Sequence, residues 1–374
     1  MRHLVPRVLE WRAAGARCAV ASVVAVRGSA PLRPGAALCV HSDGTALGSV
    51  SGGCVEGTVY DLAREVLASG QARLVSFGYS DDDAFAVGLM CGGEIDVLVQ
   101  AVEDDTARVL AAAQPAVAAR RPVVLARTLP EPGGPAVGAV AVWQDGHLGS
   151  TGSADLDLAV LADARPMLRR DDTAVRSYDL GARGGTRVLF EAWAPAPRLL
   201  VFGANAHAAA VSRIGAFLGY HVTVCDARAT FTTPERFPDA HEVVVDWPHR
   251  YLAATETDHR TVVCVMTHDP KFDVPVLAEA LGRPLAYVGA LGSRRTQARR
   301  LQDLVEAGVS PDDVAKLHAP LGLDLGGSTP QETAVSFAAE LIAVRSGRSG
   351  RPLSLLDGPI HLQGPLTGAP GAVC

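Results

Sequence analysis

The fold of this chain is decided by the stretch Arg198-Leu199-Leu200-Val201-Phe202-Gly203-Ala204-Asn205-Ala206-His207-Ala208. Its apolar run is typical of a buried parallel strand, and the glycine turn after it leads into a helix expected over 206–218. A second strand is expected at 221–226. Further strands are expected at 242–246, 261–266 and 285–288, with helices near 273–281 and 294–307. This alternation of strand and helix predicts a Rossmann-like, doubly wound parallel sheet.

The loop after the first of these strands stands where a dinucleotide-binding glycine fingerprint belongs. Gly203 fills the first glycine position, but Asn205 replaces the second glycine. That position must carry no side chain if a pyrophosphate is to approach the backbone closely. Asp226 ends the next strand near the distance expected of a ribose-binding acid, and Arg228 suits a phosphate. Two interpretations stay open: a Rossmann fold that binds NAD(P), and one that binds no nicotinamide.

Polar residues also follow the later strands of this half. His268 comes after the strand at 261–266, where it is either an acid/base group or an ordinary loop histidine. Gly292, Ser293 and Arg294 follow the strand at 285–288 and open a helix. Because anions collect at helix N-termini, these residues are candidates to hold a phosphate, the alternative being that the arginine only solvates a helix face.

Two cysteines in the first half each lie beside a pair of glycines. Cys54 follows Gly52-Gly53, and Cys91 precedes Gly92-Gly93. Glycine lets a ligand come close to the backbone, a thiolate is a soft metal ligand, and successive amides can form an anion cradle. The pattern favours capture of a metal-bearing or phosphate-bearing cofactor. The alternative is that both are small buried side chains in tight turns.

The periodicity places the two thiols at the starts of different elements. Apolar residues from Val55 onward follow helical spacing and Gly70 is the expected end, so Cys54 lies at a helix N-terminus, which favours its thiolate form. Cys91 instead precedes a strand expected at 94–100. The two thiols are therefore able to face each other across one cleft.

Composition limits the classes of protein to which the chain can belong. Its 374 residues suffice for two domains, and the net charge of −6 offers no basic field for nucleic acid. No apolar run reaches the length of a membrane span, and there is no lysine-containing phosphate-binding loop. The seven cysteines are widely spaced without a C-x-x-C pair, which argues against a disulfide framework and favours a cytoplasmic location.

A stiff spacer, Ala194-Pro195-Ala196-Pro197, is the expected domain boundary. It separates a mixed α+β domain over 1–193, interpreted as short strands around one helix, from the Rossmann-like domain over 198–346. A tail over 347–374 follows. The last long helix has a start signal at Thr329, with proline next and a glutamate three residues on.

Several sequence blocks stand in the order known from one family. They are Gly28-Ser29-Ala30-Pro31, Gly48-Ser49-Val50-Ser51-Gly52-Gly53-Cys54-Val55-Glu56-Gly57, Cys91-Gly92-Gly93, Asp226-Ala227-Arg228, Arg236-Phe237-Pro238, Met266-Thr267-His268-Asp269, Tyr287-Val288-Gly289-Ala290-Leu291-Gly292-Ser293-Arg294, Ala319-Pro320-Leu321-Gly322-Leu323-Asp324-Leu325-Gly326 and Thr329-Pro330-Gln331-Glu332. With them the chain resembles, over almost its whole length, the XdhC/CoxI proteins, accessory factors of xanthine dehydrogenase and related molybdenum hydroxylases. Met90 and Asn205 depart from the family pattern, which has glycine at both places.

The resemblance implies a factor that binds molybdenum cofactor transiently, supports its sulfuration by a cysteine desulfurase and delivers it to an apo molybdenum hydroxylase of the xanthine or CO dehydrogenase type. Cys54 and Cys91 match the two family cysteines and inherit the cofactor-binding role, as candidate molybdenum ligands. A homodimer is expected, with no nucleic acid or membrane span and no turnover by the protein itself. The alternative is an NAD(P)-dependent oxidoreductase that uses the Rossmann-like half.

Overall fold

The computed structural model describes residues 1–78, 92–130, 137–168, 172–179, 185–357 and 360. Met90 and Cys91 lie outside the described residues. The described chain falls into two compact units, Met1–Pro195 together with Ile360, and Ala196–Asp357, and each is described by itself below.

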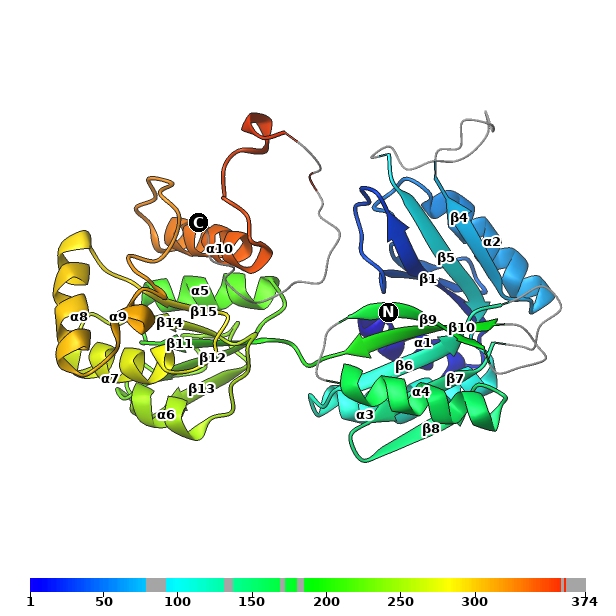
Figure 1. The fold of residues 1–374 in the computed structure, drawn as a ribbon, viewed down its shortest axis with the longest axis horizontal. Helices are drawn as coiled ribbons and strands as arrows, with labels where there is room; N and C mark the ends of the chain where they lie inside the picture. Colours follow the sequence, from blue (N-terminus) through cyan, green and yellow to red (C-terminus); the bar gives the residue numbers. More distant parts are fainter. Residues whose placement is uncertain (79–91, 131–136, 169–171, 180–184, 358–359, 361–374) are drawn as a thin grey trace. The chain divides into compact units, whose positions relative to one another are not determined.

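The first unit contains two antiparallel sheets of five strands each (Figure 1). The first sheet has the order β3-β2-β1-β5-β4, and the second has the order β8-β7-β6-β10-β9. The strands are β1 Cys18–Arg27, β2 Ala37–His41, β3 Ala46–Gly48, β4 Arg73–Phe77, β5 Glu94–Ala101, β6 Val123–Thr128, β7 Ala139–Trp143, β8 Gly146–Ser150, β9 Thr173–Asp179 and β10 Gly185–Trp193. The helices are η1 Arg2–Leu4, α1 Val5–Ala13, α2 Glu56–Ser69, α3 Asp104–Ala118 and α4 Ala154–Met167.

These elements are one motif used twice. Each copy runs helix, three strands, helix, two strands: α1 to β5 form the first copy, and α3 to β10 form the second. The strand register agrees as well. Val20 of β1 is paired with Cys39 of β2 and Gln100 of β5, and Leu125 of β6 holds the same place between β7 and β10. The expected mixed α+β domain is confirmed, but the expectation of one central helix is wrong, because the unit is an internal duplication in which each sheet packs against a helix of its own.

Each copy packs one helix against its own sheet. Val59, Ala63 and Val66 of α2 cover the first sheet, and Leu156 and Val160 of α4 cover the second. The opposite faces of both sheets share one core, in which residues of α1, α3, β1, β2, β6 and β7 pack together. Burial of this apolar surface is the main force that stabilises the unit.

A buried polar cluster lies where the two copies meet. The Arg127 guanidinium and the Glu191 carboxylate are 2.5 Å apart and almost fully excluded from solvent. Arg127 also donates to Ser22 Oγ at 2.8 Å and to Gln100 Oε1 at 3.2 Å. In the strand register, Ser22 and Gln100 are the first copy's counterparts of Arg127 and Glu191. The two halves of the unit are thus joined by equivalent positions.

The second unit is a six-stranded sheet in which all neighbouring strands are parallel, with the order β13-β12-β11-β14-β15-β16. The predicted doubly wound sheet is confirmed, and its order is the one typical of dinucleotide-binding folds. The strands are β11 Arg198–Phe202, β12 His221–Asp226, β13 Glu242–Val245, β14 Val262–Val265, β15 Tyr287–Ala290 and β16 Leu317–His318. The order reverses between β11 and β14.

Helices cover both faces of this sheet (Figure 1). One face packs against α5 Ala206–Phe217 and α10 Pro330–Ser346. The other packs against α6 Pro248–Ala254, α7 Pro270–Leu281 and α8 Arg294–Glu306. The short elements are α9 Pro311–Val314 and η2 Leu353–Leu355. The predicted start of α10 is confirmed, since Thr329 and Glu332 form a reciprocal capping box.

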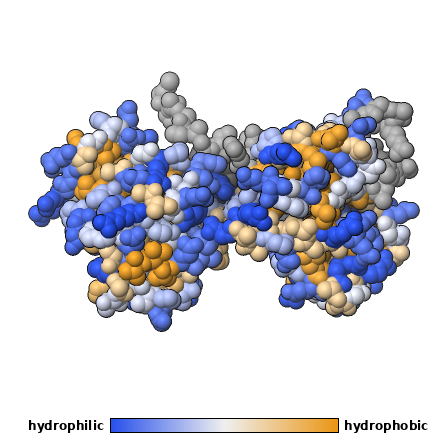
Figure 2. Space-filling model, turned by 90° about the horizontal axis from the view of Figure 1, so that it is seen from below, coloured by the Kyte–Doolittle hydropathy of each residue, from blue (hydrophilic) through white to orange (hydrophobic). Residues whose placement is uncertain are grey.

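The surface carries apolar patches among hydrophilic side chains, as Figure 2 shows for one face. Val335 and Ile342 of α10 and Phe217 at the end of α5 are among the exposed apolar residues. Within the described ranges, no helix combines the length and the apolar character needed to cross a membrane.

Candidate functional site

Glu56, the first residue of α2, organises the loop that carries Cys54 (residues 49–55, the Cys54 loop). Its carboxylate accepts hydrogen bonds from both serine hydroxyls and from three amides of this loop. The donors are Ser49 Oγ at 2.5 Å, Val50 N at 3.1 Å, Ser51 N at 2.8 Å, Ser51 Oγ at 2.5 Å and Gly53 N at 2.7 Å. A negative charge in the first turn is also favoured by the helix dipole.

Two further amides of the loop have partners within it. Gly52 N donates to Ser49 Oγ and Val55 N donates to Ser51 Oγ, both at 2.9 Å. The expectation that the amides beside Cys54 form a cradle for an anionic ligand is therefore wrong for the amides at 50–53 and 55. The physical reason is that Glu56 supplies the anion from the chain itself.

These hydrogen bonds determine the charge of Glu56. Burial raises its pKa, but hydrogen bonds from the Ser49 and Ser51 hydroxyls and from the Ser51 amide outweigh burial and lower the pKa to about 2. Glu56 is therefore ionised at neutral pH, and the loop is held by charge-assisted hydrogen bonds.

This depressed pKa predicts acid-dependent stability. Because the folded value lies below the ordinary value of 4.5, the stabilisation is complete above about pH 4.5 and is lost as the pH falls toward about 2. Glu56 is partly exposed, so we expect the discounted contribution to be about 1–2 kcal/mol. Urea unfolding of the wild type and Glu56→Gln measures it: the stability difference should be smaller at pH 3 than at pH 6. Equal differences at both pH values would contradict this account.

The outer side of the Cys54 loop is open. Cys54 is a free, half-buried cysteine, and Gly52 and Gly53 are exposed. Both glycines have positive φ, 74° and 120°, which favours glycine over other residues. A Cβ added at Gly53 would meet nothing within 4 Å. The loop thus presents one thiol beside bare backbone with room for a ligand.

The turn at residues 28–31 lies beside both glycine pairs. A Cβ on Gly52 would be 3.6 Å from Pro31. A Cβ on Gly93 would overlap the Ser29 carbonyl, so only glycine allows this close approach of the two backbones. Among the described residues, the Cys54 loop and the pair that follows Cys91 therefore share one wall.

An arginine clamp fixes the second glycine pair against this turn. Arg27, the last residue of β1, donates to Glu94 at 2.6 and 3.0 Å and to Asp96 at 2.8 and 2.9 Å. Ser76 Oγ also donates to Asp96 at 2.6 Å. Since Arg27 precedes Gly28 and Glu94 follows Gly93, the clamp holds together the two segments that meet here.

The second copy carries an equivalent loop without a thiol. The Asp157 carboxylate accepts from Ser150 Oγ at 2.7 Å and from the amide and hydroxyl of Thr151, both at 2.6 Å. Asp157 stands seven residues after Ser150, as Glu56 does after Ser49. Counted in this way, the counterpart of Cys54 is Asp155, which lies in the first turn of α4, whereas Cys54 precedes α2. The carboxylate-held loop is thus common to both copies, whereas the cysteine belongs to one.

The environments of the described cysteines predict their order of reaction. Burial raises the pKa of Cys18 to about 11 and those of Cys39 and Cys225 to about 12, and it also raises the pKa of Cys264. Cys54 is the described cysteine that is not fully buried. Because the accessible thiolate is the nucleophile, iodoacetamide at neutral pH should modify Cys54 first among these five. Peptide mapping checks this, and earlier modification of Cys39 or Cys264 would contradict it.

In the second unit, the loop after β11 is closed by its own contacts. Asn205 caps α5 through a hydrogen bond from Ala208 N at 3.0 Å, and its amide nitrogen donates to the Met266 carbonyl at 2.7 Å. Gly203 has φ 120°, and a Cβ there would crowd the backbone after β14. The departure from the glycine fingerprint therefore has a structural reason, since Asn205 joins the two loops at the reversal of strand order.

The Asp226 carboxylate is engaged by neighbouring residues. It accepts from Ala204 N at 2.8 Å and from the backbone and guanidinium of Arg228 at 2.7–2.9 Å. Burial raises the pKa of Asp226, but the hydrogen bonds from Arg228 and Ala204 lower it below its ordinary value. A ribose hydroxyl would have to compete with these partners. The ribose-binding role of Asp226 stays a prediction.

The other candidates of this unit lie at the same edge of the sheet. His268 is exposed after β14, and Gly292, Ser293 and Arg294 follow β15. Ser293 caps α8 by accepting from Thr296 N at 3.1 Å. Parallel strands bring these loops to one carboxyl edge, as predicted. The candidates thus form two groups, one in each unit.

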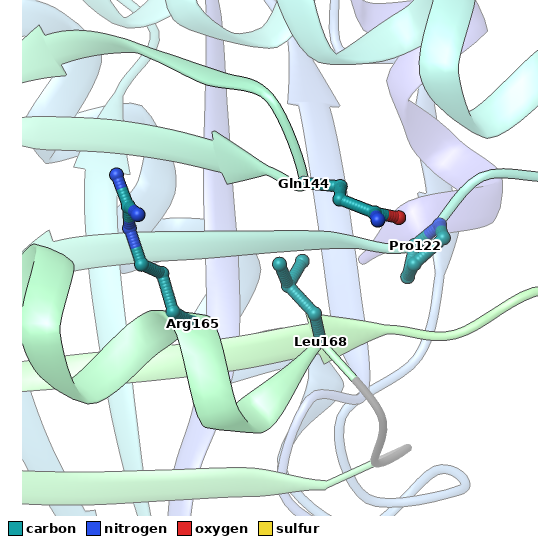
Figure 3. A pocket seen from close by; sticks show the side chains of 4 residues that line it. All are labelled: Pro122, Gln144, Arg165 and Leu168. Carbon is teal, nitrogen blue, oxygen red and sulfur yellow. The ribbon is translucent and has the colours of Figure 1, made fainter.

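A pocket elsewhere on the second copy contains none of these candidates. It is lined by Pro122, Gln144, Arg165 and Leu168 (Figure 3). Among the residues that the structure describes, no three histidine, cysteine or acidic side chains gather as a metal site. The interpretation of a site for a metal-bearing ligand therefore depends on Cys54, the described thiol that is not fully buried, and on no cluster of ligands among the described residues.

Sequence reasoning missed two residues of this site, Glu56 and Arg27. A signal for Glu56 was present, because an acid in the first turn after a serine- and glycine-rich loop can accept from that loop. Arg27 had no such signal, since its acidic partners lie 67 and 69 residues away in sequence.

Comparisons with known proteins match both units. The model of the XdhC and CoxI family matches residues 11–78, and the model of the XdhC Rossmann domain matches residues 199–341. A Bacillus subtilis protein, named as a probable subunit of xanthine dehydrogenase, is 25% identical over 87% of this chain and 92% of its own. The Escherichia coli molybdenum cofactor insertion chaperone PaoD is 27% identical over 92% of this chain and 88% of its own. A Bacillus halodurans crystal structure described as a xanthine dehydrogenase is 25% identical, with TM-score 0.70 over 92% of this chain and 96% of its own.

Proposed function

The chain belongs to the XdhC and CoxI family, and from this premise we propose that it is an accessory factor that binds molybdenum cofactor for insertion into a molybdenum enzyme. The relative named as a molybdenum cofactor insertion chaperone, which matches over most of both chains, supports this function. The factor itself catalyses no turnover; it holds the cofactor until handover.

The observation that carries the proposal is the Cys54 loop. It offers a half-buried thiol, a soft ligand, next to exposed glycine backbone with open space. These features fit the metal-bearing end of the cofactor. The amides at 50–53 and 55 donate to Glu56 and to loop hydroxyls, so we do not assign the cofactor's phosphate to them.

We assign Cys91 as the second thiol of the site. The turn at 28–31 lies against both Gly52 and Gly93, which supports an arrangement with both cysteine loops at one cleft. Because the second copy has Asp155 in place of Cys54, the expected capacity is one cofactor per chain.

The expected partners are an apo molybdenum hydroxylase of the xanthine or CO dehydrogenase type and a cysteine desulfurase that sulfurates the bound cofactor. We also propose a homodimer and a cytoplasmic location. The described cysteines are free thiols, which supports a reducing compartment.

A transfer experiment tests this function. Purified protein loaded anaerobically with sulfurated molybdenum cofactor is mixed with an apo-hydroxylase of the xanthine dehydrogenase type, and hydroxylase activity is followed over time. The proposal expects activity to rise with the amount of loaded protein, whereas the cofactor-free protein gives none. Absence of any gain from the loaded protein over free cofactor would contradict delivery.

The second candidate function is an NAD(P)-dependent oxidoreductase, favoured by the strand order of the second unit. The contacts of Asn205 and Asp226 count against this function, because both side chains already form hydrogen bonds within the protein. Titration with NAD, NADH, NADP and NADPH, followed by nicotinamide fluorescence for the reduced forms and calorimetry for the oxidised ones, separates the two. Micromolar binding of a dinucleotide without affinity for molybdenum cofactor would favour the second candidate over the first.

A further inference from the structure

We infer that Glu56 is the positioning residue of the cofactor site and acts through the Cys54 loop. The inference rests on the proposed function and deepens it. The carboxylate accepts from five donors. The two serine hydroxyls that donate to it accept in turn from Gly52 N and Val55 N. Cys54 therefore lies between two residues, Gly53 and Val55, whose amides are both fixed.

The two carboxylate oxygens have separate tasks. Oε1 accepts from Ser49 Oγ and from the amides of Val50 and Ser51. Oε2 accepts from Ser51 Oγ and from Gly53 N. Both oxygens must therefore be acceptors, which only an ionised carboxylate provides.

A glutamine at position 56 cannot replace both oxygens. Its NH2 group would face a backbone N–H or a cluster of donors, wherever the amide is turned. With the oxygen at the Oε1 place, the NH2 group faces Gly53 N and frees the residue directly before Cys54. A buried or half-buried donor left without a partner is costly, so the loop would rearrange.

The internal duplication provides the matched control. Asp157 holds its own loop by the same type of contact, yet no cysteine lies there. If carboxylates at these helix starts only stabilise the fold, Glu56→Gln and Asp157→Asn should have the same consequences. If Glu56 positions the thiol, both variants should be less stable than the wild type. Only Glu56→Gln should then change cofactor retention and the reactivity of Cys54.

The test uses the full chain, anaerobic, with molybdenum cofactor released from a purified hydroxylase as the probe. Wild type, Glu56→Gln, Glu56→Asp and Asp157→Asn are compared for molybdenum retained after gel filtration, for the rate of Cys54 alkylation and for melting temperature. We expect Glu56→Gln to lower retention about tenfold, as the loss of charge-assisted hydrogen bonds implies. It should also change the alkylation rate of Cys54 several-fold, whereas Asp157→Asn changes neither.

Glu56→Asp keeps two acceptor oxygens and should recover part of the retention that Glu56→Gln loses. Undiminished retention in folded Glu56→Gln, or an equal loss in Asp157→Asn, would overturn the inference. If the wild type retains no cofactor, the proposed function fails, and the alkylation rates still decide on positioning. Equal alkylation rates of Cys54 in the wild type and Glu56→Gln would then overturn the inference that Glu56 positions this thiol.

Discussion

Cofactor retention is expected to fall to background when Cys54 is replaced by serine. Serine keeps the size of the side chain but loses the soft, readily ionised ligand. Since Cys54 is half-buried at the edge of its core rather than inside it, the fold should stay intact. The measurement is molybdenum per chain after anaerobic gel filtration, with circular dichroism to verify folding.

The second copy offers the control for this variant. Asp155→Ser places serine two residues before Asp157, as Cys54→Ser does before Glu56, and should leave retention unchanged. Cys91→Ser should behave like Cys54→Ser if both thiols serve one site. Full retention by folded Cys54→Ser would mean that this thiol does not hold the cofactor.

The largest effect on stability is expected at the contact between the two copies. Glu191→Gln removes the charge that compensates Arg127, and both side chains are almost fully buried. Breaking a buried ion pair by removing one partner costs about 3–5 kcal/mol, because the other charge is left without compensation. Urea unfolding of the variant should show this loss as an earlier transition.

The double variant Arg127→Met/Glu191→Leu separates pairing from packing. Replacing both charges with apolar side chains removes the unpaired charge and is often close to neutral. We therefore expect it to recover most of the stability that Glu191→Gln loses. A double variant as unstable as the single one would show that the shape of the cluster, rather than its charge balance, joins the copies.

Local signals made much of the fold predictable from the sequence. The helix at α2 ends at Gly70 in the left-handed conformation, as the periodicity indicated. The strand–loop–helix run from Arg198 to Phe217 also matches. The strand expected at 285–288 lies instead at Tyr287–Ala290. Gly289 is thus a strand residue next to the Tyr287 ring, where a Cβ would not fit, rather than part of the loop that follows.

The duplication was harder to predict, because strand register carries most of it and the shared residues are few, such as Ser49 and Glu56, which correspond to Ser150 and Asp157. Ser22 corresponds to Arg127, and Gln100 corresponds to Glu191, although neither pair shares its chemistry. The Cys54 site was predicted from its glycines, because paired glycines are visible in the sequence and indicate backbone that a ligand can approach. The occupied amides were missed, because an acid in the first turn of a helix is visible in the sequence, whereas the number of loop amides that donate to it is not.

A direct binding experiment tests best whether this chain binds molybdenum cofactor. Purified cofactor-free protein is mixed anaerobically with an excess of molybdenum cofactor and passed over a gel-filtration column, and molybdenum and pterin are counted per chain. We expect both to co-elute with the protein at up to one per chain. Co-elution of neither, from protein that is folded and has a reactive Cys54, would contradict it.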